Sequence, residues 1–149
     1  MKKVYMALVF LLISSYAFAQ SGTEIDALLS EGILSAQSAA RFVLSAADKA
    51  KPDIAPRDAF NQAKESAWLP DWALPQSALN LADLSFLIMS AFEMKGGLFY
   101  GMAPGPRYAY RELLYLRAIQ GLSDPAMTLS GERFLRILGR VLDLQGGAL

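Results

Sequence analysis

Apolar residues recur at helical spacing along this chain, in segments that prolines and glycines separate. Hardly any segment alternates apolar and polar residues, as the strands of a half-buried sheet do. Residues 81–95 are apolar nearly all round, so we expect this segment to form a helix at the centre of the core. The sequence therefore predicts an all-α fold of five or six helices.

Polar caps and first-turn prolines mark the expected helix starts. The capping candidates are Thr23 (with Asp26 at capping-box spacing), Ser35, Asn80, and Ser130 or Thr128. Proline suits the first helical turn, and it begins two further segments at Pro56 and Pro106. The expected stops are breakers, namely Gly32, Pro52, Pro70, Gly96 with Gly97, and Gly121. The final helix should turn an apolar face inward, made of Phe134, Leu135, Leu138, Val141 and Leu142.

The 149-residue chain contains no cysteine and no histidine. No disulfide can hold the fold, so an apolar core must do so. The commonest general base and the usual zinc ligands are missing, and we expect no catalytic residue, no metal and no cofactor. The carboxylates left for a glycan hydrolase, the least favoured reading, are Asp71, Asp83, Glu93, Glu112 and Glu132. First-turn hydrogen bonding and the helix dipole account for Asp83 and Glu132 more simply.

Residues 1–20 have the pattern of a secretory signal: Lys2 and Lys3, an apolar run, and the small-x-small sequence of residues 17–19. The prediction is a signal peptide over 1–19 and one exported domain over 20–149. The alternative is a retained anchor, but the uncharged span of 4–19 is shorter than the roughly 20 residues a bilayer needs. Cleavage of the signal would remove Lys2 and Lys3, which leaves 12 of the 14 basic residues and all 14 acidic ones. The net charge of the exported domain would then be about −2. That balance argues against a nucleic-acid partner.

Three segments that begin at Ile33, Ala78 and Thr128 resemble one another. Each has a polar cap, a polar or acidic residue in the first turn, and then an apolar helix. The proline-started helices lie between them, so the predicted repeats are 33–77, 78–127 and 128–149, and the last copy has only its first helix.

This layout resembles the S-layer homology (SLH) module, in which three helix-loop-helix copies form a compact triangular domain. The resemblance is carried by residues 110–142, YRELLYLRAIQGLSDPAMTLSGERFLRILGRVL, and extends over about 31–144. That segment is similar to the family's helix ending near a glycine, its short loop with an aspartate, and its next capped helix. The resemblance implies an SLH-like compact bundle of helix-loop-helix repeats.

The family's Thr-Arg-Ala-Glu motif is missing here. Its arginine is expected to meet an anionic sugar of a cell-wall polymer. At the matching positions this chain has Ser35, Leu81 and Ser130, and the acidic partner persists only as Asp83 and Glu132, with Gln37 in the first copy. The resemblance therefore implies the family's fold without its polymer site.

Residues 96–113, GGLFYGMAPGPRYAYREL, connect the two helices of the second repeat and are enlarged by glycines and aromatic residues. The candidate binding residues here are Phe99, Tyr100, Arg107, Tyr108 and Arg111, since tyrosine faces stack on sugars and arginines pair with carboxylates. The alternative, which we favour, is helix packing, with Tyr110 in the core. Trp68 and Trp72 are the other binding candidates, and the alternative, which we again favour, is that they fill the seam between helical units.

We therefore expect a non-catalytic binding or scaffold protein of the periplasm or cell envelope, with an envelope protein or a cell-wall polymer as its partner. The alternative is a cell-wall glycan or peptidoglycan-binding module in which Arg107 and Arg111 replace the missing motif arginines. The sequence indicates neither the identity of the partner nor the oligomeric state.

Overall fold

The structure is a computed structural model of the chain, and it describes residues 22–147. The predicted signal peptide lies outside the described residues. Residues 22–30 are helical, and the further helices are α2 (Ala36–Ala46), α3 (Pro56–Glu65), α4 (Leu81–Ala91), α5 (Leu98–Met102), α6 (Pro106–Tyr115) and α7 (Gly131–Gly146). No strand occurs among residues 22–147, which confirms the all-α prediction; α5 is a helix that the sequence did not predict.

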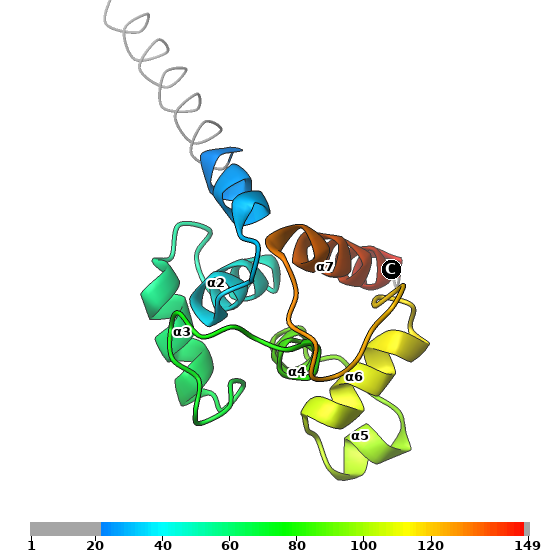
Figure 1. The fold of residues 1–149 in the computed structure, drawn as a ribbon. Coiled ribbons are helices and arrows are strands. Elements are labelled where there is room, and N and C mark those ends of the chain that lie inside the picture. The colour runs from blue at the N-terminus through cyan, green and yellow to red at the C-terminus, as the bar shows by residue number, and fades with distance from the viewer. Residues whose placement is uncertain (1–21, 148–149) are drawn as a thin grey trace, which may run out of the picture.

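The helices surround α4, which Figure 1 shows end-on near the middle of the molecule. α3 packs against α2, and α6 packs against α4, while α5 lies beside α6 at the edge. As predicted, α4 is the most deeply buried helix, with Leu84, Leu87 and Ile88 inaccessible or nearly so. None of the helices within the described range is long and apolar enough to cross a membrane.

Three helices begin with the same capping geometry. The side chains of Ser35, Asn80 and Ser130 accept hydrogen bonds from the N–H groups three residues later, at 3.3, 2.8 and 3.3 Å. These caps are as predicted, with Ser130 rather than Thr128 capping α7. They also align Ser35 and Ser130 with Asn80, so the sequence alignment of Leu81 with the two serines was wrong by one residue. Thr23 lies inside the helix of residues 22–30 and is not its cap.

The segments just before the three caps are hydrogen-bonded to one another. The Leu34 N–H donates to the Leu129 carbonyl at 2.8 Å, and the Leu79 N–H donates to the Leu34 carbonyl at 3.3 Å. Leu34, Leu79 and Leu129 each precede a cap and are buried, the position that a hydrophobic staple uses. We call these residues and the three caps the cap junction. It fixes where α2, α4 and α7 start relative to each other.

Four helices end earlier than the breakers suggested. Two positions beyond the last residue of each helix the backbone is left-handed, at Asp48, Ala67, Glu93 and Arg117, with φ of 53°, 57°, 52° and 58°. The N–H of the residue after each left-handed position donates to the carbonyl five residues earlier; the Lys49 N–H, for example, donates to the Leu44 carbonyl at 2.9 Å. This bond satisfies a carbonyl of the last helical turn that would otherwise be unpaired. The predicted stops at Pro52, Pro70, Gly96 with Gly97, and Gly121 were therefore wrong: those residues lie in the following loops.

α7 contacts the core through one face, and the helix of residues 22–30 crosses its start. Phe134, Leu138 and Val141 are buried as predicted, Ile137 joins them, and Leu142 is 42 % exposed, contrary to prediction. At Gly131 a Cβ atom would lie 1.8 Å from the Leu28 carbonyl oxygen, so only glycine allows this approach.

Candidate functional site

The enlarged connection between α4 and α6 folds around one buried tyrosine. Tyr100 is 8 % exposed, and a Cβ atom on Gly96 would lie 2.6 Å from its ring, so Gly96 makes room for it. Burial raises the pKa of the Tyr100 hydroxyl, and a hydrogen bond with Ser90 opposes that effect. Tyr100 therefore anchors α5 to the core, and its assignment to the binding surface was wrong.

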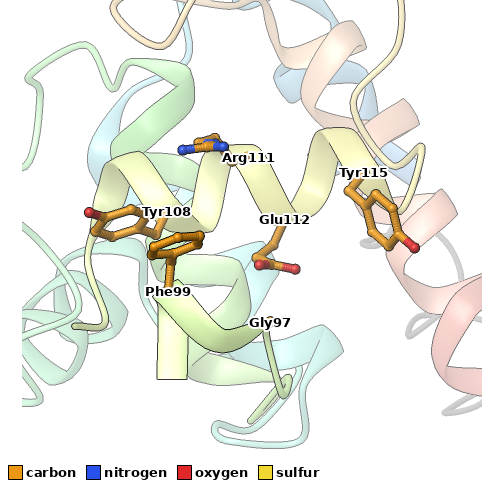
Figure 2. Close-up of a pocket in the computed structure, with 6 residues that line it drawn as sticks. All are labelled: Gly97, Phe99, Tyr108, Arg111, Glu112 and Tyr115. Carbon is orange, nitrogen blue, oxygen red and sulfur yellow. The ribbon is translucent and has the colours of Figure 1, made fainter. Parts of the chain in front are cut away.

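Anchored in this way, α5 presents Phe99 to the first turn of α6. The Phe99 and Tyr108 rings are stacked, with centroids 6.1 Å apart and planes 10° from parallel. Figure 2 shows the pair at one end of a hollow between the two helices, with Tyr115 at the other end. Phe99 keeps 62 % of its surface exposed although it stacks on Tyr108.

This hollow is a pocket of about 400 Å³, which we call the α5–α6 pocket. It is lined by Gly97, Phe99, Tyr108, Arg111, Glu112 and Tyr115. Figure 2 shows Glu112 pointing toward α5, and a Cβ atom on Gly97 would lie 2.9 Å from its Oε1 atom. Within residues 22–147 neither Arg111 nor Glu112 forms a salt bridge. The pocket thus combines three aromatic rings with one free cation and one free anion from the described part of the chain.

Three of the seven predicted binding residues come together in this pocket: Phe99, Tyr108 and Arg111. Arg107 is exposed on α6 and does not line it. Trp68 and Trp72 belong to the segment after α3, where Trp68 packs partly against the core and Trp72 is 56 % exposed. The two tryptophans therefore form no common surface with the pocket.

Sequence reasoning missed Gly97, Glu112 and Tyr115 as lining residues. A signal for the last two was available, because positions 108, 111, 112 and 115 follow helical spacing on one face. The expectation that Tyr110 packs inward was right: it is 7 % exposed, and its hydroxyl bonds the Ser123 Oγ at 3.1 Å.

The other candidate carboxylates lie elsewhere. Asp83 is buried near the start of α4, where desolvation raises the pKa of its carboxyl and hydrogen bonding from Asn80 lowers it. Glu93 pairs with Lys49, which lowers the pKa of the Glu93 carboxyl, and Glu132 pairs with Arg136. Of the five candidates, only Glu112 lines the α5–α6 pocket. No group of three metal-ligating side chains gathers within residues 22–147.

The outer surface of α5 is apolar beside this pocket. Leu98 and Met102 are 74 % and 76 % exposed, close in sequence to the exposed Phe99. We call Leu98, Phe99 and Met102, together with the pocket, the α5–α6 surface. It joins apolar contact area to a small number of polar groups, which suits binding.

No protein-family model, curated protein or solved structure matches the chain. The resemblance to the SLH module gains no support from these comparisons and is not contradicted by them.

Proposed function

We propose that this protein is a non-catalytic, exported binding or scaffold protein of the periplasm or cell envelope, which contacts a protein partner through the α5–α6 surface. One observation carries the proposal: a helix of five residues leaves Leu98, Phe99 and Met102 largely exposed.

Those three side chains are costly to leave in water. Full burial of a large apolar side chain contributes roughly 1.5–3 kcal/mol, and α5 forgoes most of that for each of them. Singly exposed apolar residues are ordinary on protein surfaces, whereas adjacent ones mark interaction sites. Methionine, aromatic residues and arginine are also the side chains enriched in protein interfaces, and all three kinds occur here.

Export and architecture are parts of the same proposal. Support for export comes from the signal-like pattern of residues 1–20. Support for an SLH-like repeat comes from the equivalent caps of α2, α4 and α7 and from the equivalent left-handed ends of α2 and α4. The family's motif arginine is absent, so the proposed contact uses different residues.

The test is sedimentation of purified protein with the envelope fraction of the source cells. Wild type should co-sediment, and protease treatment of the envelope should abolish this because the partner is a protein. Met102→Gln and Leu98→Gln should each weaken retention about 10-fold, the effect of losing one buried apolar contact. Leu122→Gln is the matched control, because Leu122 is 88 % exposed outside this surface. The proposal would be contradicted if Leu122→Gln weakened retention as much as Met102→Gln does.

A glycan-binding function is the second candidate, favoured by the ring of Phe99, Tyr108 and Tyr115 around a polar pocket. It predicts retention on purified peptidoglycan that Arg111→Ala and Tyr115→Ala reduce and Met102→Gln leaves unchanged. Arg107→Ala is the control, since Arg107 does not line the pocket. Absence of retention, or equal behaviour of Arg111→Ala and wild type, would rule this candidate out.

A further inference from the structure

Arginines gather on α7 beside the loop that leads into it. Arg133, Arg136 and Arg140 share a face of the helix, because they are three, four and seven residues apart. Together with Gln120 and Ser130 they line a pocket of about 280 Å³. A neighbouring pocket of about 290 Å³ shares Gln120 and Arg140 and adds Arg117. We call these two adjoining hollows the arginine pocket, and it shares no lining residue with the α5–α6 pocket.

The loop of residues 116–130 holds two of these guanidinium groups in place. Arg133 donates to the Leu122 carbonyl at 2.8 Å and contacts the Met127 sulfur at 3.1 Å, and Arg140 donates to the Ala118 carbonyl at 3.1 Å. Figure 1 shows this loop passing from the end of α6 to the start of α7. A guanidinium has five N–H donors, so each arginine retains donors beyond these contacts. Arg133 and Arg140 therefore present pre-oriented donors, whereas Arg117 and Arg136 are exposed side chains beside them.

Positive charge in this pocket is only partly compensated. Glu132 pairs with Arg136, whereas Arg133 and Arg140 form no salt bridge within residues 22–147. Asp143 is the other carboxylate that lines the hollows. Four arginines thus face two carboxylates, in a chain whose formal net charge is zero.

These positions also disfavour positive charge in the helix itself. Arg133 lies in the first turn of α7, where the helix dipole favours anions. Arg136 and Arg140 are four residues apart, a spacing at which like charges repel. Hydrogen bonds to the loop account for some donors of Arg133 and Arg140, and Glu132 accounts for part of Arg136, whereas no side-chain contact within residues 22–147 accounts for Arg117. A bound anion would offset the repulsion between Arg136 and Arg140.

We propose that the arginine pocket binds an anionic ligand that carries two oxyanion groups, either carboxylates or phosphates. Guanidinium groups recognise both through paired N–H donors. Arg133 and Arg136 meet one group, and Arg117 and Arg140 meet the other across the shared wall of the two hollows. Glu132 competes with the ligand for Arg136, so it lowers the affinity.

The test is calorimetric titration of the purified protein with inorganic pyrophosphate and with malonate, at an ionic strength held constant with sodium chloride. Saturable binding of one molecule is expected for at least one probe, and the tighter probe identifies phosphate or carboxylate chemistry. Arg136→Gln and Arg140→Lys should each weaken binding about 10-fold, by loss of a charge-assisted or two-pronged contact. Glu132→Gln should instead strengthen binding several-fold, because Arg136 is released.

Two α3 variants supply matched controls for charge. Arg57→Gln removes one positive charge, as Arg136→Gln does, and Glu65→Gln removes one negative charge, as Glu132→Gln does. Both positions are exposed and lie away from the pocket, so neither variant should shift the affinity. Circular dichroism of each variant confirms that it is folded. The proposal is overturned if folded wild type binds neither probe saturably. It is also overturned if the α3 variants shift the affinity as much as the α7 variants do.

Discussion

At the residue scale, Gly131 has the least room for a Cβ atom among the glycines of residues 22–147, because the start of α7 meets the carbonyl of Leu28 there. Gly131→Ala should lower the free energy of unfolding by roughly 1–3 kcal/mol, because backbone must shift to admit the methyl group. Gly139 lies in the same helix with nothing within 4 Å of its absent Cβ. Gly139→Ala should therefore raise the free energy of unfolding by about 0.5–1 kcal/mol. Urea denaturation of both variants checks this, and shifts of the same sign would contradict it.

Asp83 gives a prediction for pH. Burial raises the pKa of its carboxyl above the ordinary value of 3.8, so the folded state holds this proton more tightly than the unfolded state. The stability that Asp83 contributes is present below pH 3.8 and is lost as pH rises through the folded pKa. Asp83→Asn, which stays neutral, should be more stable than wild type at pH 7 and lose that advantage at pH 3.

Urea midpoints at the two pH values measure this difference. Asp71→Asn, at an exposed position, is the control for removing one negative charge from the chain. A stability gain for Asp83→Asn that is the same at both pH values would contradict the assignment.

At the element scale, the three equivalent caps predict which substitutions are interchangeable. Asn80→Ala should lower the free energy of unfolding by about 1 kcal/mol, because the Asp83 N–H loses its acceptor. Asn80→Ser should retain most of the stability, since Ser35 and Ser130 cap α2 and α7 with the same hydrogen bond. Thermal unfolding measures both variants. If serine costs as much as alanine, capping is not what Asn80 contributes.

The starts of α2, α3, α4, α6 and α7 were predictable from the sequence, whereas the start of α5 and the helix ends were not. Ser35, Asn80 and Pro106 could be recognised from the local sequence, because side-chain oxygens are strongly preferred at the N-cap and proline is preferred at the first helical position. The ends depend on left-handed residues such as Ala67 and Arg117, whose side chains do not favour that conformation. Their backbone is fixed by the hydrogen bond from the next N–H to the carbonyl five residues before it, and by the packing of the segment that follows. Neither can be inferred from residue type.

At the scale of the whole molecule, the cap junction joins Leu34 to Leu79 and to Leu129, residues that are far apart in the sequence, while α3 packs on α2 and α6 packs on α4. This arrangement leaves α5 at the edge, where Tyr100 reaches the core but Leu98, Phe99 and Met102 stay exposed. The sequence singled out residues 96–113 as the candidate binding segment, because its aromatic residues exceeded the needs of a connection, and that assignment stays a prediction. It could not separate Phe99 from Tyr100, since the choice between surface and core depends on the room that Gly96 leaves.

The most direct test of the account replaces Phe99 with a photoreactive phenylalanine analogue in the source cells. We expect a discrete covalent adduct with another protein on illumination, and Met102→Gln in the same chain should diminish it. The same analogue at position 57, on α3, is the control and should give no such adduct. An adduct that forms equally at both positions, or none at position 99, would contradict a protein-binding role for the α5–α6 surface.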